Sequence, residues 1–181
     1  MDFTRAEAPI VLEVARDDAW QMVVALERAS GQRLYGYALR LGVDAGRAGD
    51  LVQEALLRLW RELSAGADIR SPEAWTYGAL ARLAMDEHRL HRRIATLISR
   101  LGEGPAPRTM EVESTERVAV WDQVDRLLDR QRQVIYLRHQ ADLSFEEIGQ
   151  VMGITPGAAR SHATTALRTL RARLDVIGAE R

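Results

Sequence analysis

The chain has 181 residues, of which 46% are hydrophobic and 28% are charged, and its formal net charge is −1. These values are typical of a globular protein with one or two small domains. Cysteine is absent, which excludes disulfide frameworks, thiolate nucleophiles and thiolate metal sites. No apolar run is long enough to span a bilayer, and acids interrupt the N-terminus where a signal peptide needs an apolar core. We therefore expect a cytoplasmic protein with no membrane insertion.

The basic residues, all of them arginine, concentrate in two parts of the chain. Residues 70–100 and 130–181 have an excess of arginine over acids, and the segment between them is acidic. Guanidinium groups suit phosphates and base edges. This segregation is compatible with nucleic-acid contacts at two places, although solvated helix faces would also produce it.

The first part of the chain predicts a leader and two helices. Residues 1–16 are expected to form a loose leader, and Asp17 begins a helix that runs to about Leu26. After Gly31 a second helical pattern continues to about Gly42.

The clearest amphipathic pattern of the first half lies between Asp50 and Leu63. Its apolar residues form a wide stripe that is expected to be buried. Another face carries, at helical spacing, two acids, an amide and a leucine: Asp50, Gln53, Glu54 and Leu57. On spacing alone this face is either a solvated surface or a docking face for a partner helix.

Aromatic residues precede a strongly basic helix in the segment that begins at Ser71-Pro72. Trp75 and Tyr77 come first, and the far end of the helix is dense in arginine, with Arg89, Arg92 and Arg93. Rings that stack on bases and arginines that neutralise phosphates are typical of sites for unpaired nucleic acid. The alternative for Trp75 is packing in a core. His88 and His91 do not match the motif of helical di-metal sites, so no metal is expected there.

Gly, Pro, Ser and acids gather in residues 99–116, which predict a linker. Helical patterns resume after it, and no segment alternates as a strand would. We therefore predict an all-α fold of two small helical domains, 17–98 and 117–178, joined by a flexible linker.

Two helices and a tight turn are predicted near the C-terminus. Ser144 and Glu147 form a capping box, and Gly153 suits a left-handed helix end. Thr155 and Pro156 then suit the N-cap and first position of a second helix. The expected buried stripe of that helix is Ala159, Ala163, Ala166, Leu170 and Leu174.

The rest of the second helix is rich in hydrogen-bond donors near its start, including Arg160, Ser161 and His162. Two helices around a short glycine-containing turn are typical of a helix-turn-helix, whose second helix enters the DNA major groove. An ordinary helical hairpin with a solvated basic face is the alternative.

Taken together, these segments resemble the extracytoplasmic-function group of sigma factors of bacterial RNA polymerase, over roughly residues 17–175. Asp50, Leu51, Gln53 and Glu54 stand in the motif DLVQE, and WTYGALARLAMDEHRLHRR and LSFEEIGQVMGITPG follow in the family's order. The resemblance implies a region 2-like first domain and a region 4-like second domain. It also implies three kinds of partner: the polymerase core, promoter DNA as duplex and melted strand, and an anti-sigma factor that masks the docking face.

The resemblance assigns residues to three surfaces. Core polymerase would be bound by Asp50, Gln53, Glu54 and Leu57. The minus-ten element would be melted and read by Trp75, Tyr77, Arg82, Arg89, Arg92 and Arg93. The minus-thirty-five element would be read by Thr155, Pro156, Ala158, Arg160, Ser161, His162, Thr165 and Arg168.

Several positions depart from the family pattern. Gly78, Ala79 and Arg82 stand where arginine, isoleucine and asparagine are usual, and the longer, charged Arg82 is expected to alter the minus-ten preference. The second helix of the helix-turn-helix, here called the readout helix, carries Ala158 and Thr165 and has fewer cations than is usual in the family. The loss of two cations is expected to flatten the salt dependence of duplex binding by about two units of log–log slope. Gly49 replaces a usual acid beside Asp50, which is expected to affect core docking.

Two other functions fit parts of the pattern. One is a stand-alone DNA-binding regulator, and the other is a sigma-like interaction protein that has lost promoter recognition. An enzyme is not expected, because no phosphate-binding glycine loop, metal-spaced cluster or nucleophile–base arrangement is present in the sequence. No catalytic residue, metal or cofactor is therefore assigned.

Overall fold

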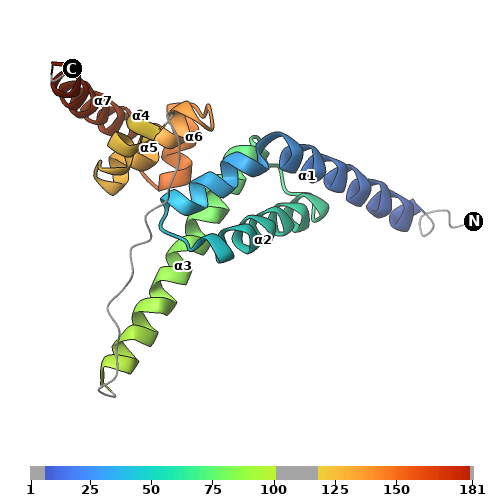
Figure 1. The fold of residues 1–181 in the computed structure, drawn as a ribbon. Coiled ribbons are helices and arrows are strands. Elements are labelled where there is room, and N and C mark those ends of the chain that lie inside the picture. Colours follow the sequence, from blue (N-terminus) through green and yellow to red (C-terminus); the bar gives the residue numbers. More distant parts are fainter. Residues whose placement is uncertain (1–6, 101–117, 180–181) are drawn as a thin grey trace, which may run out of the picture.

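The computed structural model describes residues 7–100 and 118–179. The N-terminal domain consists of helices α1 (Glu7–Arg40), α2 (Ala45–Ser64) and α3 (Pro72–Arg100). The C-terminal domain consists of α4 (Val118–Asp125), α5 (Asp129–His139), α6 (Phe145–Met152) and α7 (Pro156–Ala179) (Figure 1). Within these residues there is no strand, which confirms the all-α prediction. The predicted linker lies outside them from residue 101 onward, whereas residues 99 and 100 belong to α3.

Local capping signals begin the helices where the sequence predicts them. The Ser144 side chain accepts a hydrogen bond from the Glu147 amide, and the Glu147 carboxylate accepts one from the Ser144 amide at 2.8 Å. Gly153 then ends α6 in the left-handed region, with φ of 64°. Thr155 Oγ1 accepts from the Ala158 amide at 3.1 Å, and Pro156 opens α7. The predicted helix-turn-helix is therefore confirmed in its boundaries.

The prediction was wrong at the start of the chain. A single helix, α1, runs from Glu7 to Arg40, so residues 7–16 are helical and Gly31 does not divide two helices. Pro9 falls in the first turn, where proline costs little. Glycine inside a helix costs only about 1 kcal/mol relative to alanine. Burial of Leu34 and Tyr37 just beyond Gly31 offsets that cost.

The hydrophobic core crosses the boundary between the two domains. In the N-terminal domain the apolar side of α2 is buried against α1 and α3. In the C-terminal domain the predicted stripe of α7 is buried at Ala159, Ala163, Ala166 and Leu170, whereas its last predicted member, Leu174, is exposed. A single cluster of buried residues contains side chains of both, from Leu34 and Tyr77 on one side to Tyr136 and Ile148 on the other. The domains therefore pack against each other, which the sequence did not predict.

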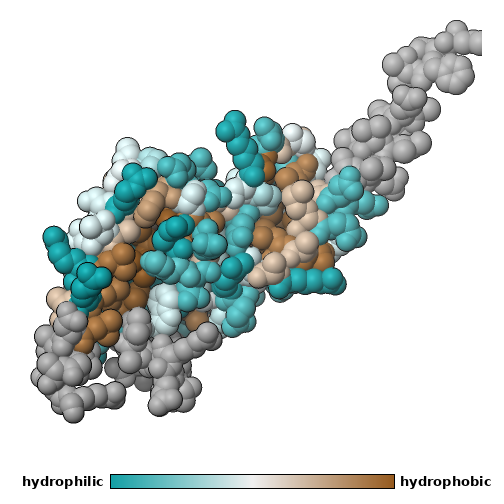
Figure 2. Space-filling model, turned by 90° about the horizontal axis from the view of Figure 1, so that it is seen from above, coloured by the Kyte–Doolittle hydropathy of each residue, from teal (hydrophilic) through white to brown (hydrophobic). Residues whose placement is uncertain are grey.

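The surface alternates between apolar and polar areas. Seen from above, brown hydrophobic areas lie over each half of the molecule, with hydrophilic side chains between them (Figure 2). The ends of α1, α3 and α7 extend outward from the common centre (Figure 1). In the part of the chain that is described, no helix combines the length and apolar character needed to cross a membrane.

We predict that Glu147→Gln destabilises the fold at neutral pH and not in acid. A hydrogen bond from the Ser71 hydroxyl, followed by those from Ser144, lowers the pKa of Glu147. A carboxyl whose pKa is lower in the folded state contributes stability above its unfolded pKa and loses it as the pH falls through the folded value. We expect a loss of about 1 kcal/mol at pH 7, because the site is partly exposed. Urea unfolding of both proteins between pH 7 and pH 3 measures the difference.

The matched control for this prediction is Glu146→Gln, which removes the neighbouring exposed carboxylate from the same turn. It is expected to behave as the wild type across the pH range. An equal loss in both variants, or a loss that persists in acid, would contradict the role of the Glu147 hydrogen bonds.

Candidate protein-docking and nucleic-acid interfaces

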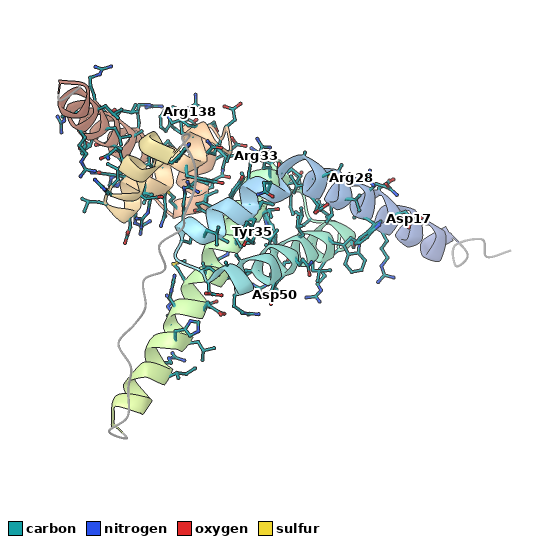
Figure 3. All side chains as sticks on the ribbon, viewed as in Figure 1. Asp17, Arg28, Arg33, Tyr35, Asp50 and Arg138 are labelled. Atoms are coloured by element: carbon teal, nitrogen blue, oxygen red, sulfur yellow. The ribbon has the colours of Figure 1, made fainter. Side chains whose placement is uncertain are left out.

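The four residues predicted to dock a partner lie together on an exposed face of α2. Leu57 is 41% exposed, Gln53 is exposed, and the side chains of Asp50 and Glu54 are 62% and 41% exposed. Asp50 lies on the outer side of α2, away from the C-terminal domain (Figure 3). The opposite side of the helix is the buried one, so this face is not needed for the fold.

Ion pairs hold the acids of this face in place. Arg47 donates to Asp50 at 2.7 Å, and Arg58 donates to Glu54 at 2.9 Å. Arg47 also donates to Glu87 of α3 at 3.2 Å, and this hydrogen bond is the main reason why the pKa of Glu87 is lowered. Exposed pairs of this kind contribute little stability, so they orient the carboxylates more than they strengthen the fold.

A groove between α2 and α3 continues the docking face. Besides the acids, it is lined by Leu51, Leu83 and Leu90, with Arg47, Arg58 and Glu87 at its charged edges. An apolar floor with charged edges suits a partner helix. The sequence analysis missed the α3 side of this groove. The arginines three and four residues from the acids could have been found from their spacing, whereas Glu87 could not.

The residues predicted to contact the minus-ten element divide between two sides of α3. Trp75, Arg82 and Arg89 are seven residues apart, close to two turns each, and therefore follow one line along the helix. Trp75 is half-buried, whereas Arg82, Arg89 and Arg93 are exposed. Arg89 pairs with Asp86 at 3.2 Å. The Arg92 side chain lies outside the described part.

The structure differs from the prediction at Tyr77. It lies two residues after Trp75, about 200° around the helix, and is fully buried. Its ring packs edge-on against Tyr37, with centroids 5.2 Å apart. Burial raises the pKa of its hydroxyl, which has no hydrogen-bond partner among the described residues. Tyr77 is therefore a core residue in this structure, not a surface that could stack on a base.

A second groove lies beside Trp75 and Arg82. The α2–α3 connection forms one wall with Asp68, Ile69 and Arg70, and α6 of the C-terminal domain forms another with Glu147, Gln150 and Val151. The groove is thus built from both domains.

The predicted readout residues surround the start of α7. Thr155, Pro156, Arg160, Ser161 and Arg168 are exposed, and Ala158, His162 and Thr165 are partly exposed. Arg160, Ser161 and Arg168 lie on the side of the helix away from the buried Ala159 and Ala163, whereas Ala158, His162 and Thr165 lie at the border of the buried side. Free donors at the start of this helix suit contacts to base edges and phosphates.

The structure adds an aromatic support that the sequence analysis did not find. The guanidinium of Arg160 lies 5.1 Å from the centroid of the Phe145 ring, and that of Arg138 lies 5.5 Å from the same ring. Arg138 is further fixed by a hydrogen bond to the Leu143 carbonyl at 3.0 Å. Phe145 therefore restricts Arg160, the first arginine of α7.

The described residues hold no group of three or more His, Cys, Asp or Glu side chains that could bind a metal ion. His88 Nε2 lies 2.7 Å from the Leu41 carbonyl oxygen and so joins α3 to the end of α1.

Family profiles match both domains. Residues 26–94 match Sigma-70 region 2, and residues 124–172 match Sigma-70 region 4. The ECF RNA polymerase sigma factor SigL of Mycobacterium tuberculosis is 31% identical over 153 residues, which are 82% of this chain and 86% of SigL. The chain belongs to the extracytoplasmic-function (ECF) sigma factors. It is thus a transcription initiation factor, and the resemblance read from its motifs is confirmed.

Other relatives of this ECF sigma factor agree. SigK of Mycobacterium ulcerans is 31% identical over 150 residues, covering 79% of this chain and 80% of SigK. The sigma factor RpoE of Bartonella quintana, solved with the anti-sigma factor NepR, has a TM-score of 0.67 and 21% identity, covering 88% of this chain and 98% of that one. CnrH, solved with the cytosolic domain of CnrY, has a TM-score of 0.58 and 22% identity, covering 92% and 96% of the two chains. Both share the fold.

We predict that Tyr77→Phe leaves promoter opening by this sigma factor unchanged. The hydroxyl is buried with no hydrogen-bond partner in the described part of the chain, so its removal abolishes a desolvation cost and keeps the ring in the core. The free energy of unfolding is expected to stay equal or to rise by about 1 kcal/mol. Urea unfolding and permanganate footprinting of an open promoter measure both quantities. A loss of promoter opening with unchanged stability would restore Tyr77 to the DNA-contacting set.

Proposed function

We propose that the exposed α2 face of Asp50, Gln53, Glu54 and Leu57 binds the polymerase core. The observation that carries this proposal is the position of these residues: they share one exposed face whose exposure the fold itself does not require. The paired acids give a docking helix a defined charge pattern, and Leu57 offers it an apolar contact.

We further propose that α3 and α7 recognise the two promoter elements. Arg82, Arg89 and Arg93 would neutralise the phosphates of the melted minus-ten strand, and Trp75 would offer a ring beside them. Arg160 and Ser161 would enter the major groove of the minus-thirty-five duplex, with Thr155 and Arg168 toward its backbone. The polymerase would carry out the chemistry, so this chain would act as a specificity factor without catalysis of its own, without a cofactor, and in the cytoplasm with its polymerase.

An anti-sigma factor is the third proposed partner. RpoE and CnrH, which share this fold, were each solved with a bound protein, NepR and the cytosolic domain of CnrY. The groove between α2 and α3 offers such a partner an apolar floor next to the docking face.

The proposal is tested by mixing purified core polymerase, with and without this protein, with a library of promoter fragments and sequencing the DNA held in open complexes. We expect enrichment of fragments that share two spaced motifs, and only when both proteins are present. Enrichment by this protein alone would instead support a stand-alone regulator. Core binding without enrichment of any sequence would indicate a sigma-like protein without promoter recognition.

We predict that the double change Gln53→Ala and Leu57→Ala weakens core binding at least about tenfold, since contacts at the centre of an interface dominate affinity. Both side chains are exposed, so the unfolding free energy is expected to remain unchanged. Fluorescence anisotropy of labelled protein titrated with core measures the affinity. The control is Gln21→Ala with Leu128→Ala, which removes the same two residue types from exposed positions elsewhere. Equal affinity for core in the two double variants would refute the docking face.

We predict that Arg160→Ala weakens binding of the minus-thirty-five duplex by about 1–3 kcal/mol, the range for a good arginine–base contact. Arg28→Ala, which removes an exposed cation of α1, serves as the control for charge loss (Figure 3). Binding is measured by anisotropy at two salt concentrations with the duplex enriched in the library. If the two variants bind equally well at moderate salt, Arg160 has no role in base readout.

A further inference from the structure

Helix α1 begins well before the part of the chain that matches the sigma family. The match to Sigma-70 region 2 starts at residue 26, whereas α1 starts at Glu7. Some of the added turns are held against the rest of the domain, because Ala19 and Val23 are each only 5% exposed. Val23 belongs to the same buried cluster as Leu56 of α2. The part of α1 that contains these two residues is therefore packed into the N-terminal domain.

Trp20 lies in these added turns, contacts α2 and stays at the surface. Its ring packs edge-on against the ring of Trp60 in α2, with centroids 6.4 Å apart and an interplanar angle of 87°. Asp17, in the turn before Trp20, marks this part of α1 in Figure 3. Although the rings are in contact, Trp20 is 49% exposed and Trp60 is only partly buried. The pair offers a partner a large and rigid apolar contact.

The tryptophan pair lies at one edge of the proposed docking face. Trp60 follows Gln53 by seven residues, close to two turns, so both side chains lie on one line along α2. It follows Leu57 by three residues, which places it about one turn closer to the end of the helix. The two acids of the face, in contrast, line the groove on the α3 side. The docking face is thus bordered by α3 along one edge and by Trp20 of α1 along the other.

A second exposed apolar side chain lies at the same level of α1 but on another side of it. Met22 comes two residues after Trp20, about 200° around the helix, and is 46% exposed. Single exposed apolar residues are normal on protein surfaces, so exposure alone does not distinguish the two. What distinguishes Trp20 is its contact with Trp60 beside the docking face.

From this arrangement we infer that Trp20 and Trp60 extend the core-binding surface, and that the polymerase element that docks on α2 also covers Trp20. This inference rests on the proposed function of the α2 face. The partner is the polymerase core because Trp60 directly adjoins Leu57. A helix seated on Gln53 and Leu57 that continues for one more turn, about 5.4 Å, reaches the tryptophan pair. Tryptophan is enriched among the residues that dominate the affinity of interfaces.

The first experiment compares the affinities of Trp20→Ala and Met22→Ala for core polymerase. Anisotropy of protein labelled at its C-terminus, titrated with core, measures both. Trp20→Ala is expected to bind core about tenfold more weakly than the wild type, as the loss of an interface tryptophan does. Met22→Ala is expected to bind as the wild type does. Trp20→Phe keeps a ring against Trp60 and is expected to retain most of the affinity.

The docking-face variant with Gln53→Ala and Leu57→Ala separates this inference from the proposed function. If that variant loses affinity for core while Trp20→Ala and Met22→Ala bind equally well, the extension by Trp20 is overturned and the proposed function stands. If neither the wild type nor any variant binds core, both are refuted. Urea unfolding of Trp20→Ala checks that a weaker affinity is not a loss of the folded state.

The second experiment keeps an aromatic side chain at position 20 and so does not depend on the stability of Trp20→Ala. Photoreactive benzoylphenylalanine replaces Trp20, Met22 or Leu57 in separate full-length chains, which are mixed with core, irradiated and analysed by mass spectrometry. The probe in place of Leu57 identifies the polymerase segment that docks on α2. The probe in place of Trp20 is expected to cross-link to the same segment or to its next turn, and the probe in place of Met22 is not.

Two results of the cross-linking would overturn the inference. One is equal cross-linking of core from positions 20 and 22. The other is a cross-link from position 20 to a second copy of this chain in place of core, which would assign the tryptophan pair to self-association. Absence of any cross-link to core from position 57 would instead contradict the proposed docking face itself.

Discussion

The arrangement of the whole molecule depends on one buried ring. Tyr136 is stacked on Tyr37, and its hydroxyl reaches the backbone of α1 because residue 36 has no side chain. A tyrosine in this position needs both an apolar surrounding and a hydrogen-bond acceptor, and α1 supplies the two within one turn. The same cluster of buried residues includes Ile148 and Met152 of α6, the helix of the C-terminal domain that packs on α3.

The features that the sequence predicted are those encoded by neighbouring residues. Ser144, Glu147, Gly153 and Thr155 set the boundaries of two helices through hydrogen bonds and backbone angles that span four residues or fewer. Helical spacing likewise placed Asp50, Gln53, Glu54 and Leu57 on one face, which is exposed as a docking surface requires. Caps and helical spacing depend only on residues close in the sequence, so they can be predicted without knowledge of the rest of the fold.

Features that depend on the angle around a helix, or on a partner distant in the chain, were not predicted correctly. Trp75 and Tyr77 are both aromatic, but residues two apart in a helix point to nearly opposite sides, so only Trp75 remains at the surface. The Arg47–Glu87 pair joins residues of different helices, and Tyr136 lies about a hundred residues from the carbonyl that it contacts. Gly31 does not end a helix, since one glycine costs a helix less than the burial of the residues around it contributes.

A core shared by two domains ties their stabilities together. Residues such as Leu34, Tyr77, Tyr136 and Ile148 belong to one cluster, so neither domain keeps its full set of apolar contacts when the other unfolds. The protein is therefore a single cooperative unit, although its helices form two domains. Separation of the domains exchanges that cooperativity for two smaller units with newly exposed apolar surface. A protein whose domains have separated is therefore more prone to aggregation and proteolysis than one whose domains are packed together, unless polymerase and promoter cover the exposed surface.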